Sequence, residues 1–267
     1  MRAEYELSNL KGRRNPYFKD FFSEQATGYA QYRPTYPEDL FRYLTSLTPE
    51  HTCAWDCGTG SGQAAAGLVP YYGQVIATDP SKEQLAQASP HPKVNFQVAS
   101  AEDSGIPSSS VDLIVAGQAL HWFDLPRFYA EVRRIAKPSG SIIAVWCYAL
   151  AEIAPAVDAV TWRYYHDVVG KYWGPERRLV EQGYRGISFP FEEIIPPSFC
   201  MEAKWNLKHL SGYFSTWSAT QAAIRSLKSD PMDQIRTELQ KAWVPTSSTK
   251  VVRWPLFLRV GRVFSTE

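Results

Sequence analysis

The sequence predicts an α/β fold whose core is a mostly parallel, doubly wound sheet with helices on both faces. Between residues 51 and 149, short β-rich or apolar runs alternate with segments of helical pattern five times. A glycine-rich turn directly follows the first run, as in a tight strand-to-helix connection. Together with two later strand-like runs, this pattern indicates a sheet of seven strands.

The N-terminal part predicts a helical cap over the sheet. Residues 1–16 form a polar, basic tail whose charged side chains are most simply solvated. Aromatic residues at near-helical spacing then predict an amphipathic helix over residues 17–32, which ends before Arg33-Pro34. Pro37 favours the first turn of a second helix, which runs to Leu47.

The strands and helices of the core lie between breaks rich in glycine, proline and polar residues. We expect the five strands at residues 51–57, 74–78, 94–99, 111–116 and 141–146. We expect the helices between them at residues 63–69, 82–88 and 126–136.

The regular alternation ends at about residue 149. Residues 151–172 have the pattern of one amphipathic helix rich in aromatic side chains, and an irregular connection follows. Residues 198–206 and 251–263 have strand character, and residues 218–243 are largely helical. The chain therefore divides into an N-terminal tail and cap helix (1–36), a ligand-binding core (37–149), an inserted aromatic lid (150–197), and C-terminal strands and helix that complete the sheet (198–267).

Charge and composition indicate a small-molecule partner. The 28 basic and 27 acidic side chains give a formal net charge of +1, which does not indicate a nucleic-acid-binding surface. The first residues lack the apolar core of a signal peptide, and no apolar run approaches the roughly 20 residues that span a bilayer. We therefore expect a cytoplasmic protein without a membrane partner. The four cysteines form no Cys-x-x-Cys pair, so we expect buried thiols and no metal site. No pattern indicates an oligomeric state.

The glycine-rich turn indicates which ligand the core binds. Such a turn lets the backbone approach a ligand and directs the next helix's N–H groups toward it. Dinucleotide enzymes use the spacing Gly-x-Gly-x-x-Gly, whereas here the glycines are Gly58, Gly60 and Gly62, and Gln63 stands at the third place. Asp56 would repel a pyrophosphate but can hold a cationic amine. S-adenosylmethionine carries an ammonium and a sulfonium and no phosphate, so the turn favours this cofactor.

Asp79 follows the turn by about 20 residues, at the end of the second strand, where a carboxylate can accept hydrogen bonds from both ribose hydroxyls. This contact does not distinguish the two cofactors. A tight turn without a ligand, a non-catalytic S-adenosylmethionine-binding module and an NAD-dependent oxidoreductase remain as alternatives.

Several motifs resemble a known family. They are Trp-Asp-Cys-Gly-Thr-Gly-Ser-Gly-Gln at residues 55–63, Ala-Thr-Asp-Pro-Ser at 77–81, Ala-Glu-Asp at 101–103 and Val-Asp-Leu-Ile at 111–114. Through them, residues 20–150 resemble the class I S-adenosylmethionine-dependent methyltransferases. Two further motifs are similar to a small-molecule branch that includes trans-aconitate-type and ubiquinone-biosynthesis-like members. They are Ala-x-x-Tyr-x-x-x-Arg-Pro-x-Tyr-Pro at 26–37 and Gln-Ala-Leu-His-Trp-Phe at 118–123.

The resemblance implies a Rossmann-like fold in which the glycine turn wraps the methionine portion of the cofactor and Asp79 binds the ribose. It also implies that residues 118–122 border the sulfonium and the acceptor. Many members carry an acidic residue at the position of Ser100, which leaves open whether Ser100, Glu102 or a backbone group contacts the adenine. The expected cofactor-binding residues are Tyr29, Arg33, Asp56, Gly58, Thr59, Gly60, Asp79, Pro80, Ser100, Ala101, Glu102, Gln118 and Ala119.

The acceptor site is less sharply defined. Methyl transfer from a sulfonium needs an acceptor held in line and water kept out, and it needs a base only if the acceptor must lose a proton. His121 is the candidate base, because it follows the fourth strand, although a packed or cofactor-lining histidine beside Trp122 is the simpler interpretation. His166 is either catalytic or part of a small core, and Arg33 either pairs a carboxylate of a ligand or forms a surface salt bridge. The expected substrate-binding residues are Tyr32, His121, Trp122, Trp146, Tyr148, Trp162 and His166.

Overall fold

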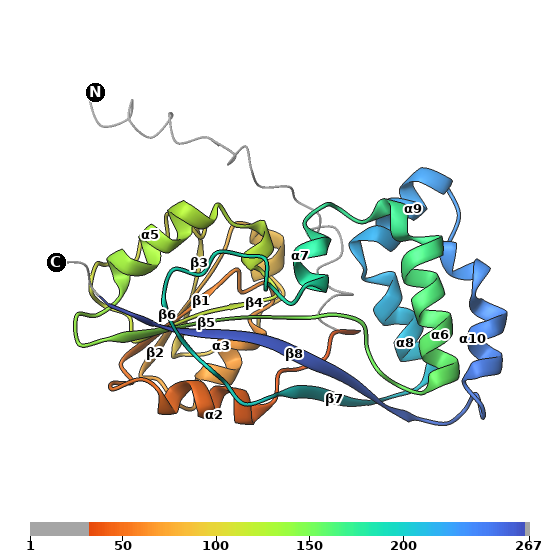
Figure 1. The fold of residues 1–267 in the computed structure, drawn as a ribbon, viewed down its shortest axis with the longest axis horizontal. Coiled ribbons are helices and arrows are strands. Elements are labelled where there is room, and N and C mark those ends of the chain that lie inside the picture. The colour runs from red at the N-terminus through yellow and green to blue at the C-terminus, as the bar shows by residue number, and fades with distance from the viewer. Residues whose placement is uncertain (1–31, 265–267) are drawn as a thin grey trace.

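The computed structural model describes residues 32–264. Most of the expected cap helix and the predicted cofactor residue Tyr29 lie outside the described residues. Figure 1 shows a central sheet with helices on both sides and a group of helices at one end. The strands are β1 Cys53–Cys57, β2 Gln74–Asp79, β3 Val94–Val98, β4 Leu113–Gly117, β5 Ser141–Tyr148, β6 Glu192–Ile194, β7 Cys200–Trp205 and β8 Lys250–Val263.

In the first half of the described chain, helices alternate with strands as predicted. The helices of residues 32–264 are α2 Glu38–Ser46, α3 Gln63–Leu68, α4 Lys82–Leu85, α5 Leu125–Ile135, α6 Pro155–Arg163, α7 Arg177–Glu181, α8 Leu207–Ser215, α9 Ser218–Leu227 and α10 Arg236–Ala242. Short helical turns complete the set: η2 Leu120–Trp122, η3 Tyr164–Val168, η4 Gly170–Tyr172 and η5 Pro231–Gln234.

The sheet has the strand order β3-β2-β1-β4-β5-β8-β6, and β7 also pairs with β8. The first five strands are parallel to one another, whereas β8 is antiparallel to β5, β6 and β7. The predicted α/β, mostly parallel, doubly wound architecture is therefore confirmed. The expected count of seven strands omitted β6, a three-residue edge strand of sequence Glu-Glu-Ile that has no apolar alternation to reveal it.

Successive side chains of the central strands pack on opposite faces of the sheet, as the pleat requires. Ala54 of β1 packs with Leu40 of α2 and Leu68 of α3, and its neighbour Trp55 packs with Phe128 of α5 on the other face. Figure 1 shows α2 and α3 on one side of the sheet and α5 on the other. The two apolar layers fix the carboxyl ends of β1, β2 and β4 side by side at one edge.

The helices α6, α8, α9 and α10 gather beyond that edge, and we call them, with η3, η4 and η5, the helical unit (Figure 1). Within it α6 packs on α10, and η4 packs on α9. The division of the chain at residue 197 stays a prediction. Helices from both sides of residue 197 build this one unit.

Two long helices expected from the sequence are shorter in the structure. Residues 151–172 do not form one helix, because Pro155 starts α6 and the helix widens at η3 into a π turn, in which the Val169 amide donates to the Tyr164 carbonyl (3.0 Å). Residues 218–243 are divided into α9, η5 and α10 at Pro231, whose ring cannot continue a helix. Helix α8 was not predicted.

No helix among residues 32–264 has both the length and the apolar character that crossing a bilayer requires.

Candidate cofactor and acceptor site

The glycine turn between β1 and α3 is held against the end of β2. The amides of Gly58 and Thr59 both donate to the Thr78 carbonyl, at 2.9 and 3.0 Å. Gly58 has a φ of +70°, a conformation that side chains disfavour, and a Cβ there would lie 2.7 Å from the Cβ of Ala119. The turn therefore needs glycine both for its backbone and for its close packing on residue 119.

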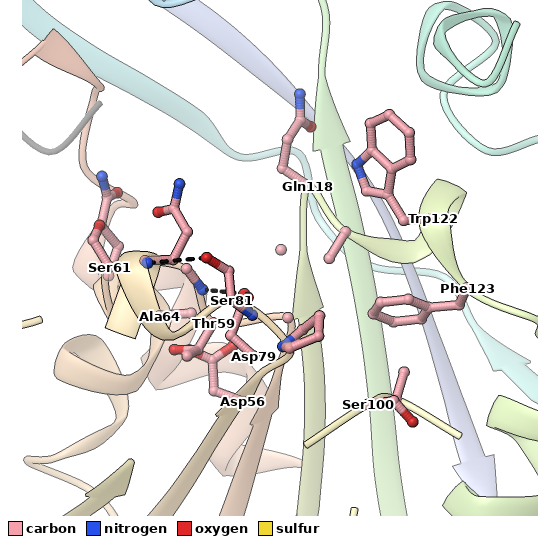
Figure 2. Close-up of a pocket in the computed structure, with 18 of the residues that line it drawn as sticks. Asp56, Thr59, Ser61, Ala64, Asp79, Ser81, Ser100, Gln118, Trp122 and Phe123 are labelled. Carbon is pink, nitrogen blue, oxygen red and sulfur yellow. Dashed lines mark hydrogen bonds between the residues drawn. The ribbon is translucent and has the colours of Figure 1, made fainter. Parts of the chain in front are cut away.

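Asp79, at the end of β2, connects this turn to the next loop. One carboxylate oxygen, Oδ2, accepts the Gly60 amide at 2.9 Å, and Oδ1 accepts the Ser81 amide at 2.9 Å. Figure 2 shows Asp79, Thr59 and Ser81 close together on one side of a cavity, with Trp122 and Phe123 across from them. Both loops are thereby held to one carboxylate at the rim of the sheet.

Asp56 is the most deeply buried carboxylate of the site, with 1% of its surface exposed. Its Oδ2 accepts the Thr59 hydroxyl at 2.5 Å and the Ala65 amide at 2.8 Å, while Oδ1 receives no hydrogen bond from residues 32–264. Burial raises the pKa of Asp56 to about 6, against the hydrogen bonds from Thr59 and Ala65, which lower it. The site thus holds a carboxylate whose charge is poorly compensated by the protein.

These residues border a cavity at the carboxyl ends of the strands, which we call the first cavity. It is lined by Arg33, Tyr36, Asp56, Gly58, Thr59, Gly60, Ser61, Gln63, Ala64, Asp79, Pro80, Ser81, Gln84, Ser100, Ala101, Glu102, Gly117, Gln118, Ala119, Trp122, Phe123, Asp124, Arg127 and Tyr148. Every cofactor residue that the sequence predicts within residues 32–264 lines this cavity. Tyr36 and Phe123 also line the cavity and stand in the two motifs that are similar to the small-molecule branch, but neither is among the expected site residues.

The loop after β3 forms one wall of the first cavity and is held from behind. Glu102 lines the cavity, and its Oε1 accepts the Asp124 amide at 2.9 Å. Below it, Glu131 of α5 accepts the Ser104 amide at 2.9 Å and pairs with Arg134 at 2.7 Å. The wall is thus fixed by a helix more than twenty residues away in sequence, and no local pattern indicated this support.

A second cavity adjoins the first beneath the helical unit. It is lined by Arg33, Gln118, His121, Trp122, Tyr148, Ala149, Leu150, Trp173, Gly174, Glu176, Arg177, Tyr213, Trp217 and Ser218. Arg33, Gln118, Trp122 and Tyr148 line both cavities. The sequence indicated those four and His121, but it did not indicate the wall contributed by η4, α7, α8 and α9.

Gln118 stands at the junction with an uncommon backbone. Its φ is +57°, which a residue with a side chain adopts only when its surroundings impose it. The backbone N–H of Gln118 donates to the Trp146 carbonyl (2.7 Å). In its side chain, Oε1 accepts the Tyr148 backbone N–H (3.0 Å) and Nε2 donates to the Tyr148 carbonyl (3.3 Å). The end of β5 therefore fixes Gln118 between the two cavities.

Arg33 is part-buried between the core of the fold and the helical unit. The guanidinium is part-buried, donates to the Tyr148 hydroxyl and the Thr216 carbonyl at 3.3 Å each, and lies 5.1 Å from the centre of the Tyr213 ring. It joins the core of the fold to the helical unit at the boundary of the two cavities.

His121 lies in the wall of the second cavity, with Nδ1 2.8 Å from the Tyr184 hydroxyl. Burial, together with the positive charge of Arg177, lowers the pKa of His121 to about 3. The imidazole is therefore neutral at neutral pH. A neutral ring with so low a pKa orients hydrogen bonds well and accepts a proton weakly.

Four residues expected to bind substrate line neither cavity. Trp146 is fully buried and packs edge-on against Tyr36, and Tyr32 packs against His209. Trp162 and His166 contact each other, with ring centres 4.5 Å apart, on the solvent side of the helical unit. The π turn η3 places Tyr164 and Tyr165 inside and His166 outside, so this arrangement gives no support to a substrate role for Trp162 or His166.

Comparison with known proteins agrees with this geometry. The family model described as a methyltransferase domain matches residues 55–144. A candidate methyltransferase of Dictyostelium discoideum is 34% identical over 252 residues, which cover 92% of this chain and 95% of that protein. The chain belongs to the class I S-adenosylmethionine-dependent methyltransferases.

Two further relatives are similar to this methyltransferase. The solved structure of a candidate type II methyltransferase from Anaeromyxobacter dehalogenans is 44% identical, with a TM-score of 0.81, and the match covers 88% of this chain and 99% of that one. A candidate S-adenosylmethionine-dependent methyltransferase of Saccharomyces cerevisiae, CRG1, is 29% identical over 175 residues, 61% of this chain and 60% of that protein. Membership of this family confirms S-adenosylmethionine as the predicted cofactor, in preference to NAD.

The first cavity of the methyltransferase suits this cofactor. Asp56 and Asp79 offer carboxylates to an ammonium group and to ribose hydroxyls, and the glycine turn leaves room for close approach of its backbone. Asp56 in particular has an oxygen without a hydrogen bond from residues 32–264 and a charge that a cation would stabilise.

Proposed function

We propose that this methyltransferase methylates a small molecule that binds in the second cavity, under the aromatic helical unit, while S-adenosylmethionine occupies the first cavity. The observation that carries the proposal is the shared wall: Arg33, Gln118, Trp122 and Tyr148 border both cavities. A donor in one cavity and an acceptor in the other would meet at these four side chains.

The protein's own residues would act mainly by binding and positioning. The glycine turn, Asp56 and Asp79 would hold the cofactor, which supplies a methyl group activated by its sulfonium charge. Gln118, fixed by the end of β5, would define the passage between the cavities. Trp173 and Trp217, from the helical unit, would exclude water and orient the acceptor by its apolar surface.

His121 contributes to the acceptor cavity as a neutral group. Its contact with the buried Tyr184 hydroxyl fixes the ring. With its pKa lowered to about 3, His121 would orient an acceptor by hydrogen bonding, and a general-base role would require an acceptor that gives up its proton easily.

Blocking the second cavity tests the proposal without touching the first. Ser218, the first residue of α9, lines only the second cavity, and Ser218→Phe would place a ring inside it. We expect S-adenosylmethionine binding by calorimetry to be unchanged and transfer of labelled methyl groups to a metabolite extract to fall at least about 10-fold. Ser226→Phe, on the exposed face of the same helix, is the matched control and should keep full transfer.

The same assay distinguishes other functions. Label recovered only in protein or nucleic acid, and not in small molecules, would contradict a small-molecule acceptor. Tight cofactor binding with no labelled product in any fraction would favour a module that binds S-adenosylmethionine without methyl transfer.

A further inference from the structure

Arg177, the first residue of α7, carries a charge that has no direct ion pair with a carboxylate of residues 32–264. Arg134, Arg253 and Arg259 each form an ion pair with a carboxylate. Arg177 forms none with any carboxylate of residues 32–264, although the side chain is half-buried. Such a cation has lost part of its hydration without a direct ion pair, since Glu181 is linked to it only through the Tyr165 hydroxyl, and this favours binding of an anion.

Neighbouring side chains hold the Arg177 guanidinium in place. Nε donates to the Tyr165 hydroxyl at 2.5 Å, and that hydroxyl donates to Glu181 Oε1 at 2.5 Å. The Arg177 guanidinium carbon lies 4.8 Å from the centre of the Trp173 ring and 5.2 Å from that of Tyr165. Only Nε is used by the described residues, so the two Nη groups keep their donors for a ligand.

The charges that line the second cavity are predominantly positive. Arg33 and Arg177 are cationic, Glu176 is anionic, and His121 is neutral because its pKa is about 3. Glu176 turns back over its own loop, since its Oε2 lies 2.6 Å from the position that a Cβ on Gly174 would take. The cavity therefore suits an anion better than a cationic amine.

Arg177 lines the second cavity and not the first, whereas Arg33 lines both. A group bound by Arg177 would lie away from the shared wall where methyl transfer takes place. We propose that Arg177 binds an anionic group of the acceptor through its Nη donors, and that a different atom of the acceptor faces the cofactor. This inference rests on the proposed function.

The surrounding walls define the rest of the acceptor. Trp122, Trp173, Tyr213 and Trp217 give the cavity broad aromatic faces, which pack against flat or apolar surfaces. The acceptor class is thus an apolar or aromatic molecule that carries one carboxylate or phosphate. A guanidinium binds either anion through paired N–H groups.

Calorimetry on the protein loaded with S-adenosylhomocysteine tests this proposal without relying on turnover. The probes are indole-3-acetate, its amide, the related amine tryptamine, and phenyl phosphate. We expect the carboxylate to bind about 10- to 100-fold more tightly than the amide, because it gains charge-assisted hydrogen bonds, and the amine to bind weakest. Comparison with phenyl phosphate shows which anion the cavity prefers.

Variants of Arg177 test whether this residue causes the preference for the carboxylate over the amide. Arg177→Met keeps the apolar stem that packs on Trp173 and should abolish the preference for the acid, while Arg177→Lys should keep only part of it. Arg178→Met, the exposed neighbour on α7, should preserve it in full.

Two sets of results overturn the anchor. One is equal binding of acid and amide, or no binding of either, while S-adenosylhomocysteine still binds. The other is an acid preference that survives in Arg177→Met. In both cases the proposed function stands, because it fails separately, through loss of S-adenosylhomocysteine binding or of labelled small-molecule product.

Discussion

Asp56→Asn is expected to stabilise the cofactor-free protein and to weaken cofactor binding. Asparagine has the shape of aspartate, and its side-chain oxygen can accept the same two hydrogen bonds, from the Thr59 hydroxyl and the Ala65 amide. The substitution therefore removes the buried charge and keeps the shape of the side chain and both hydrogen bonds.

The size of the stability effect follows from the pKa of Asp56. Burial raises it from 3.8 to about 6, which corresponds to about 3 kcal/mol of folding free energy at pH 7. Because the folded chain keeps this proton to a higher pH than the unfolded chain does, folding stability from Asp56 falls as the pH rises from about 4 to about 6. Asp56→Asn should therefore be more stable than the wild type at pH 7, by up to about 3 kcal/mol, and should lose this advantage at pH 4.

The same charge should favour cofactor binding. An ammonium group binds the ionised carboxylate, so S-adenosylmethionine affinity should fall about 10-fold from pH 7 to pH 5 as Asp56 gains its proton. In Asp56→Asn the affinity should be weaker, by about 10-fold or more, and should not follow this pH dependence.

Urea unfolding at pH 4 and pH 7, together with calorimetric titration of S-adenosylmethionine at pH 5 and pH 7, measures both effects. A variant that is less stable than the wild type at pH 7, with unchanged cofactor affinity, would refute the reasoning. It would show that Asp56 is a structural residue whose charge the fold needs.

Three further predictions concern the same site. Gly58→Ala should lower the Tm and abolish cofactor binding, because the new Cβ would lie 2.7 Å from the Ala119 Cβ. Gly105→Ala is the control, since Gly105 has a similar φ, +69°, but open space around it. Equal losses of Tm and of cofactor binding in both variants would contradict the packing argument. Asp79→Asn should weaken S-adenosylmethionine binding about 10-fold or more in calorimetry by removing a charged acceptor, while the exposed Asp103→Asn should bind normally. At saturating cofactor, kcat should show no inflection between pH 5 and 8 that depends on His121, because its pKa is about 3 and the ring stays neutral over this range; an inflection near pH 6.5 that His121→Gln removes would argue against this assignment.

That the expected cofactor residues of the described chain meet at one cavity was predictable, because the information for it is local. Asp56, Gly58 and Asp79 lie at strand ends or directly after them, and the ends of adjacent parallel strands meet at one edge of a sheet. The hydrophobic alternation therefore fixed both the elements and the neighbourhood of the site.

The second cavity, where we propose that the acceptor binds, was not predictable, because distant segments build it. Arg177 begins α7, which packs on β5 and η2. Tyr213 of α8 and Trp217, directly before α9, come from the helical unit. The helical pattern of residues 151–172 left open whether His166 faces the cavity or packs in a small core. In the structure His166 is exposed and contacts the exposed Trp162 one turn earlier, where the chain widens into the π turn η3. Such a turn depends on tertiary packing and leaves no periodic signal in the sequence.

A crystal structure of the protein with S-adenosylhomocysteine tests the central claim most directly. We expect S-adenosylhomocysteine in the first cavity, with its amino group at Asp56, its ribose at Asp79, and its sulfur facing the second cavity between Gln118, Trp122 and Tyr148. A product molecule in the first cavity whose sulfur faces away from that shared wall would contradict the assignment of the second cavity to the acceptor.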